Sequence, residues 1–349
     1  MDYGYANARI RGMHSRLLDR KGYEALLVQP DIPAMVTELG KTPYKAEIEE
    51  GTVLYPGIRG IEYALRKNLA TTFRKVQGLL AGSDAEIFVR IFVSRYDIHN
   101  LKTIIRGIHI HISPEEITEC LIPAGTISSA LLNELLKQGD VRGVVDLLAT
   151  WDVIYTRPLT AHMKEYAETG SLSSLEYALD LFHYENSKKT LTGKTADHKL
   201  MQSILAAEID SVNIKTALKM NREGISPEES AQYFLPGGTH LPLKLYRKLV
   251  AAPSIGEAVS VLQGTSYEFL VSLPLQSLAN AEISLIEKEM DRYLVRKGAS
   301  LYHSEPLGGV LCIGYLFEKQ NEVTNIRIIG RFKTAMISDA DVEETLLYV

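Results

Sequence analysis

Residues 97–126, DIHNLKTIIRGIHIHISPEEITECLIPAGT, align without a gap to residues 210–239, DSVNIKTALKMNREGISPEESAQYFLPGGT. The two stretches begin 113 positions apart and are identical at twelve of their thirty positions. A weaker third copy begins at Glu322, 112 positions further on. Because solenoid repeats are usually only about 20 to 50 residues long, this spacing indicates several similar small domains.

The copies share a polar pattern on an apolar background. An acidic residue stands three positions before an asparagine, and a basic residue stands two positions after it. The repeat-core residues are Asp97, Asn100 and Lys102, then Asp210, Asn213 and Lys215, and then Glu322, Asn325 and Arg327. The N-terminal stretch carries a shorter version, Asn7 and Arg9, which stands 93 positions before Asn100.

We predict a structural role for the repeat-core residues. A buried amide on an apolar helix usually bonds a backbone group of a neighbouring element. The acidic residue is expected to pair with the basic residue of its own or a neighbouring helix. A ligand-binding role is less favoured, because it would have to exist three times in one chain.

Each copy also contains the signals of a helical hairpin. In residues 113–116, Ser-Pro-Glu-Glu, the serine can cap the helix, the proline suits its first position and the second glutamate completes a capping box. Residues 226–229 repeat this signal, and residues 338–341 carry a version without proline. The Pro/Gly turns at 123–126 and 236–239 then end the helix.

The sequence therefore predicts an all-α protein made of three similar helical units. We place them at residues 1–96, 97–209 and 210–349. Because the asparagine pattern occurs at both ends of the chain, we expect the last helix to pack on the N-terminal helix. This packing would close the three units into a ring-like body.

Composition limits the possible classes of function. The chain has 349 residues, of which 46% are hydrophobic, and a net charge of −5. Its longest apolar run, 308–317, is about half of the roughly 20 residues that span a bilayer. The acidic balance argues against nucleic-acid binding. The polar N-terminus does not read as a signal peptide, and Cys120 and Cys312 are expected to be reduced core residues.

No pattern makes a convincing catalytic, cofactor or metal site. Gly193-Lys194-Thr195 resembles the end of a phosphate-binding loop, but Lys188 stands where the loop would need its first glycine. His109 and His111 have no histidine counterparts in the second copy, where Arg222 and Gly224 stand instead. We therefore expect no catalytic residue, no cofactor and no metal.

Three stretches carry a family resemblance. They are residues 3–18, YGYANARIRGMHSRLL, residues 184–191, YENSKKTL, and residues 314–327, GYLFEKQNEVTNIR. With the repeated Asp/Asn cores, they resemble the C subunit of the archaeal and V-type rotary ATP synthases, which is the counterpart of the d subunit of the eukaryotic V-ATPase. The resemblance spans essentially the whole chain. It departs at residues 331–333 and 336–339, where a glycine-lysine pair and a proline-containing cap are expected.

The resemblance implies a non-catalytic rotor subunit of an ATP synthase or ATPase that moves protons or sodium ions. In that family three helical domains form a pseudo-threefold funnel. The funnel joins the shaft subunits of the central stalk to the membrane proteolipid ring and transmits torque between them. The implied location is peripheral, on the cytoplasmic side of the cell membrane, without direct membrane insertion.

Two other interpretations remain open at this stage. The chain can be a soluble helical adaptor or scaffold unrelated to rotary ATPases. It can also be a helical enzyme, which would require a cluster of ionisable residues in one non-repeated pocket. Convergence of His109, His111, His183 and Glu185 in space would favour the enzyme.

Overall fold

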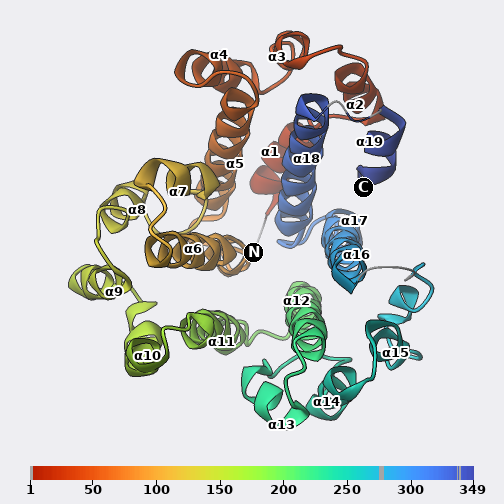
Figure 1. Cartoon of the computed structure of the whole chain (residues 1–349). Coiled ribbons are helices and arrows are strands. Elements are labelled where there is room, and N and C mark those ends of the chain that lie inside the picture. Colours follow the sequence, from red (N-terminus) through yellow and green to blue (C-terminus); the bar gives the residue numbers. More distant parts are fainter. Residues whose placement is uncertain (1–2, 275–278, 336, 338) are drawn as a thin grey trace. The chain divides into compact units, whose positions relative to one another are not determined.

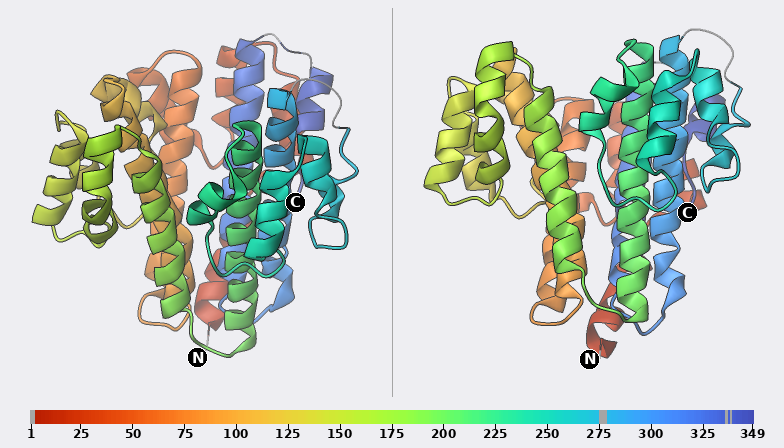
Figure 2. Two further views of the ribbon diagram at one scale, coloured as in Figure 1. Left: turned by 60° about the horizontal axis from the view of Figure 1, so that its bottom comes forward. Right: turned by 90° about the horizontal axis from the view of Figure 1, so that it is seen from below.

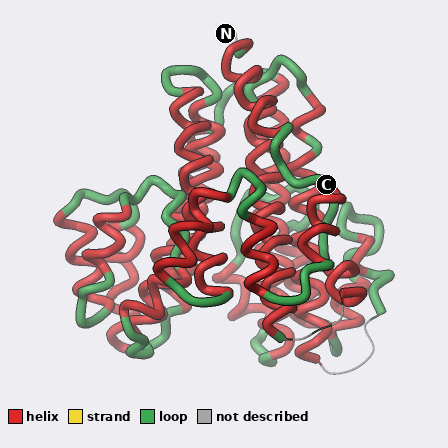
Figure 3. The backbone as a smooth tube through the Cα atoms, turned by 90° about the horizontal axis from the view of Figure 1, so that it is seen from above, coloured by secondary structure: helices red, strands yellow, loops and turns green. Residues whose placement is uncertain are grey.

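The computed structural model describes residues 3–274, 279–335, 337 and 339–349. Every regular element within these ranges is a helix, which confirms the all-α prediction (Figures 1 and 3). By its contacts the chain forms two compact units. Unit 1 is Met1–His183 with Ala299–Val349, and unit 2 is Tyr184–Gly298. The division into 1–96, 97–209 and 210–349, and the funnel arrangement, stay predictions.

The middle of the sequence supplies one series of helices to unit 1. It consists of α6 (Glu86–His109), α7 (Pro114–Cys120), α8 (Ser129–Leu135), α9 (Val141–Thr150), α10 (Thr156–Thr169) and α11 (Ser173–Thr190), the last of which crosses the boundary between the units. Leu101, Leu148 and Leu179 are completely buried in the core of this series. Figure 2 shows the long helices α6 and α11 running side by side, and Lys102 of α6 bonds Asp180 of α11.

Unit 2 contains a second series of similar length. It contains α12 (Ala196–Arg222), α13 (Pro227–Ser230), the 3-10 turn η1 (Ala231–Tyr233), α14 (Leu243–Ala251), α15 (Ile255–Ser260), the 3-10 turn η2 (Glu268–Leu270) and α16 (Ala279–Ala299). Its core is formed by residues such as Ile214, Tyr246 and Ile286, all of which are inaccessible to solvent.

The two ends of the sequence form the rest of unit 1. The N-terminal helices are α1 (Gly4–His14), α2 (Arg20–Leu27), α3 (Ile32–Leu39), α4 (Lys45–Leu54) and α5 (Ile58–Leu80), and the C-terminal helices are α17 (Leu301–Ser304), α18 (Leu311–Thr334) and α19 (Asp339–Thr345). Helix α18 contacts α1, α2, α3 and α5, so the two ends of the chain share one core (Figure 1).

The predicted helix starts form as expected at the first two copies. Ser113 Oγ accepts a hydrogen bond from the Glu116 N–H at 3.3 Å, and Ser226 Oγ accepts one from the Glu229 N–H at 3.1 Å. In both helices proline occupies the first turn, which confirms the capping prediction. Ser338, the expected cap of the third copy, lies outside the described residues.

The cysteines differ from one another. Cys312 is buried in α18, as expected of a core residue, but Cys120 is exposed. The prediction for Cys120 was wrong because this residue ends α7, a short helix that buries only Ile117. The apolar character of the surrounding sequence does not show which face of so short a helix meets the core.

Candidate functional site

The asparagines of the repeat core each hold one residue further along the chain. In every copy the amide nitrogen donates to the carbonyl of a residue 22 positions later, and the N–H of that residue donates to the amide oxygen. These asparagine clasps join Asn100 to Ile122, Asn213 to Leu235 and Asn325 to Leu347 at 2.7 to 3.2 Å. Since both groups of the clasped peptide find a partner, a loop can be buried there without an unpaired donor or acceptor.

Asp97 holds the turn that follows the first clasp. Its carboxylate accepts from the Thr126 N–H at 3.0 Å and the Ile127 N–H at 2.8 Å, and also from the Thr126 hydroxyl. The Tyr155 hydroxyl adds a bond at 3.2 Å. Burial raises the pKa of the Asp97 carboxyl above its ordinary value, and these hydrogen bonds oppose that rise.

Asp210 makes the same arrangement in unit 2. Backbone N–H groups of Thr239, His240 and Leu241 donate to its carboxylate at 2.9 to 3.3 Å. The Tyr267 hydroxyl donates at 2.9 Å. The carboxylate therefore closes a second turn by the same chemistry as Asp97.

The third carboxylate reaches across the sequence. Glu322 accepts from the Leu18 N–H at 2.5 Å and from the Tyr44 hydroxyl at 2.6 Å. The Lys319 ammonium, which is also buried, lies 2.7 Å from Glu322, and burial lowers the pKa of Lys319. Asp97 receives its hydrogen bonds from residues 126–155 of its own repeat. Glu322 instead receives the equivalent hydrogen bonds from residues 18–44, at the other end of the sequence. The third repeat is thus completed by the N-terminal helices.

The pairing predicted for the lysines was wrong. Lys102 bonds Asp180 at 2.5 Å and Lys215 bonds Asp291 at 2.5 Å, whereas Asp97 and Asp210 bind turns. On a helix an acidic residue five positions before a lysine does not share its face, because side chains meet at spacings of three and four. The partners come from α11 and α16.

The N-terminal asparagine does not form a fourth clasp. Asn7 Nδ2 donates to the Gly308 carbonyl at 3.2 Å, and its buried amide oxygen has no hydrogen-bond partner among the described residues. Arg9 is exposed on α1, and Arg327 is half-buried on α18. Whether the repeat-core residues act as one structural set stays a prediction.

Sequence reasoning missed three tyrosines that complete the carboxylate sites. Tyr44, Tyr155 and Tyr267 are buried and each precedes a helical turn. Tyr155 and Tyr267 lie 58 and 57 positions after the carboxylate that they bond. This near-constant spacing was one available signal. A second was the similarity of residues 31–44 and 254–267, which end in Tyr44 and Tyr267 and also share an isoleucine, a valine, a leucine and a threonine at matching positions.

The residues considered for catalysis have separate surroundings. His109 Nδ1 lies 2.9 Å from the Tyr166 hydroxyl, His111 is exposed, and Glu185 is exposed beside Lys189. His183 is buried, and its Nδ1 lies 3.2 Å from the Ser94 hydroxyl. Within the described part of the chain, no three His, Cys, Asp or Glu residues are placed to share a metal ion.

The Gly-Lys-Thr stretch lies in the loop between α11 and α12. The Thr195 hydroxyl accepts from the His198 N–H at 3.4 Å and caps α12. A Cβ on Gly193 would lie 2.2 Å from the His198 ring, so the glycine lets that ring pack closely against the loop. The capping role explains Thr195 without a phosphate.

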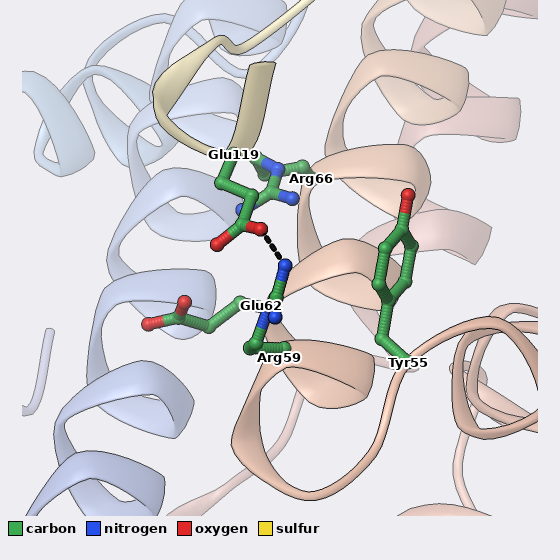
Figure 4. Close-up of a pocket in the computed structure, with 5 residues that line it drawn as sticks. All are labelled: Tyr55, Arg59, Glu62, Arg66 and Glu119. Atoms are coloured by element: carbon green, nitrogen blue, oxygen red, sulfur yellow. Dashed lines mark hydrogen bonds and ion pairs between the residues drawn. The ribbon is translucent and has the colours of Figure 1, made fainter. Parts of the chain in front are cut away.

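Unit 1 contains a groove between α5, α7 and α8. Its volume is about 510 Å³, and basic side chains of α5 face Glu115 and Glu119 of α7 across it. Figure 4 shows a smaller pocket that shares Tyr55, Arg59, Arg66 and Glu119 with the groove; there Arg59 bonds Glu119 and Arg66 lies beside them. A second cavity of about 410 Å³ lies beside α2 and α18 and is lined by Glu318 and Glu322 among others.

These features define a class of protein. The repeated polar residues fasten loops to long helices, and the described helices include none that is both long enough and apolar enough to cross a bilayer. The chain is a helical repeat protein whose most regular polar chemistry is used for internal bonding.

Comparison with known proteins identifies the family. The family model described as ATP synthase (C/AC39) subunit matches residues 6–345. The A-type ATP synthase C subunit of Methanococcoides burtonii is 31% identical over 347 residues, which cover 99% of this chain and 94% of the relative. The C subunit of Haloferax volcanii is 32% identical, over 98% of this chain and 97% of the relative. The chain belongs to the ATP synthase (C/AC39) subunit family.

Proposed function

We propose that this chain is a non-catalytic rotor subunit of an A/V-type ATP synthase or ATPase that moves protons or sodium ions. It would link the shaft subunits of the central stalk to the membrane proteolipid ring and transmit torque between them. The observation that carries this proposal is the match to the C subunits of A-type ATP synthases over nearly the full length of the chain. It would act at the cytoplasmic side of the cell membrane, as a peripheral member of the complex.

The internal bonding supports a mechanical role. A part that transmits torque must resist local opening of its loops under load. The three asparagine clasps and the carboxylate sites fasten those loops at buried positions, where a broken hydrogen bond leaves an unsatisfied polar group at a cost of about 1–3 kcal/mol. None of these bonds requires a substrate or a cofactor.

Recoupling of a stripped motor tests the proposal. Membranes bearing the proteolipid ring are freed of the soluble head, the shaft and this chain, and then rebuilt with or without this chain. We expect ATP-driven ion pumping and retention of the shaft on the ring only when the chain is present. Pumping and retention that are the same without it would overturn the proposal and favour a helical adaptor.

A further inference from the structure

One ion pair has the same place in all three repeats. The basic residue six positions after each clasp asparagine bonds a glutamate on the last long helix of the repeat. These pairs are Arg106 with Glu176, Lys219 with Glu287 at 2.7 Å, and Arg331 with Glu62 at 2.6 Å. They align α11, α16 and α5 as equivalent helices, and the sequence Glu-Tyr-Ala-Leu, present at both 62–65 and 176–179, supports the match of α5 with α11.

The neighbouring ion pair is present in only two repeats. Lys102 and Lys215, two positions after their asparagines, bond Asp180 and Asp291 at 2.5 Å. Each aspartate stands four positions, or about one helical turn, after the glutamate of the first pair.

The third repeat reverses one charge at this place. Two positions after Asn325 stands Arg327, and four positions after Glu62 stands Arg66. Where the sister repeats have a lysine facing an aspartate, this repeat has two arginines. Both Arg66 and Arg331 act on Arg327 as like charges and lower its pKa, although burial is the largest cause of that shift.

The carboxylates nearby are already engaged. Glu62 bonds Arg331, and Glu119 bonds Arg59. Burial lowers the pKa of Arg66, while Glu62 and Glu119 act at longer range to raise it. Among the described residues, neither the Arg66 nor the Arg327 guanidinium has a carboxylate within ion-pair distance. The cluster therefore holds four arginines and two glutamates.

The groove beside this cluster extends the positive charge. Besides Arg59 and Arg66 it is lined by Arg74 and by Lys67 of α5, the latter paired with Glu50, against the two glutamates of α7. Leu121, Pro123 and Leu132 supply an apolar side. A small anion such as phosphate needs only the cations, whereas a cationic row next to an apolar strip matches a peptide that carries both acidic and apolar side chains.

We propose that the groove between α5, α7 and α8 binds an acidic segment of a partner protein. One of its carboxylates pairs with Arg66, which stands where the sister repeats carry Asp180 and Asp291. The segment's apolar side chains contact Leu121, Pro123 and Leu132. The partner would be another member of the same motor, and to that extent this inference rests on the proposed function.

Arg66→Asp tests the inference, because it restores within the chain the carboxylate of the sister repeats. The variant places an aspartate opposite Arg327, so the isolated chain is expected to melt at the same or a higher temperature. Arg142→Asp, an exposed change of equal charge on α9, is the control. Arg66→Gln removes the charge without adding another, and covers the case in which Arg66→Asp does not fold.

Two measurements use the full-length chain. The first is fluorescence anisotropy with a labelled amphipathic Glu/Leu peptide, with inorganic phosphate and phosphatidylglycerol vesicles as competitors. We expect peptide affinity to fall at least tenfold in Arg66→Asp and Arg66→Gln but not in Arg142→Asp. The second is retention of each variant on the rebuilt motor at rising salt concentration, where the two Arg66 variants should dissociate at lower salt.

The outcomes separate this inference from the proposed function. Equal peptide binding by wild type and both Arg66 variants overturns the inference. Complete displacement of the labelled peptide by inorganic phosphate or by the vesicles also overturns it, because the groove would then bind a simple anion or a lipid headgroup. If wild type restores pumping and the Arg66 variants restore it equally at all salt concentrations, the proposed function stands and the groove has no part in assembly. If wild type itself fails to restore pumping, the proposed function fails, while the peptide measurement still decides the groove.

Discussion

Two glycines show why the carboxylate sites depend on single residues. A Cβ on Gly125 would lie 2.0 Å from Asp97 Oδ1, and one on Gly238 would lie 1.7 Å from Asp210 Oδ1. The turn must approach the carboxylate closely so that several backbone N–H groups can donate to it together. No side chain fits at these positions without moving the turn away.

We therefore expect Gly125→Ala and Gly238→Ala to destabilise the protein by about 1–3 kcal/mol or more, because the added methyl group overpacks a bonded site. Gly78→Ala is the control: it lies within α5 and has no atom within 4 Å of its Cβ position. That change should be neutral or stabilise by up to about 1 kcal/mol. Urea unfolding followed by circular dichroism measures all three, and equal effects at the three sites would contradict the prediction.

His183 should make stability depend on pH. Burial lowers its pKa to about 3 from the ordinary value of 6.5, so the folded protein keeps the ring neutral where the unfolded chain takes up a proton. The stability that the neutral ring contributes is fully present above pH 6.5, the pKa in the unfolded chain. It is lost as the pH falls from 6.5 toward the folded pKa of about 3. The free energy of unfolding should fall by about 1.4 kcal/mol for each pH unit within this window.

Unfolding of wild type and His183→Leu between pH 7.5 and pH 5 measures this contribution. Near pH 5 we expect protonation of His183 to have lowered the free energy of unfolding of wild type by about 2 kcal/mol. In His183→Leu this decrease should be absent. His303→Leu changes an exposed histidine and serves as control. Parallel pH profiles of wild type and His183→Leu would show that the ring does not contribute.

At the scale of elements, short helices depend on their caps more than long ones do. Helix α7 has seven residues and buries only Ile117. A helix of this length is marginal by itself, so the Ser113 hydroxyl and its acidic first turn supply much of what holds it. Its place matters because Glu115 and Glu119 form one wall of the groove.

Ser113→Ala should cost about 1 kcal/mol, and Ser113→Asp should restore most of it, since aspartate caps equally well. Hydrogen exchange of residues 114–121 should rise in the alanine variant while exchange in α18 stays unchanged. If the aspartate variant is as unstable as the alanine variant, the hydroxyl has another role than capping.

At the scale of the whole molecule, the third repeat joins the two ends of the sequence. Asn325 clasps Leu347, while Glu322 binds Leu18 and Tyr44, some 300 residues away along the chain. Folding of this repeat requires both ends to be present, because neither segment supplies all the donors and acceptors by itself.

Asn325→Ala should loosen residues 346–349, which contain the clasped Leu347, more than residues 97–183. Amide hydrogen exchange by mass spectrometry detects this difference. In the matched variant Asn213→Ala, the increase should fall on residues 227–241. Equal exchange in residues 346–349 of wild type and Asn325→Ala would show that the clasp does not hold this segment.

Much of the local structure could be predicted from the letters. The helix caps at Ser113 and Ser226 and the all-helical class follow from short-range patterns that act within a few residues. The clasp asparagines were found because they recur at nearly constant spacing. The lysine partners and the three tyrosines were not predicted. Short matches such as Glu-Tyr-Ala-Leu at 62–65 and 176–179 are present, but they do not show which helix faces which.

By itself the sequence determined where helices begin, which polar residues repeat and which family the chain resembles, because each depends on local chemistry or on repeated letters. Only the tertiary structure decided that the third repeat is closed by residues 18–54, and that Arg66 lies near Arg327 where the sister repeats pair an aspartate with a lysine. These facts depend on which helix faces which. That choice follows from the packing of side chains distant in sequence, and no single stretch of the chain encodes it.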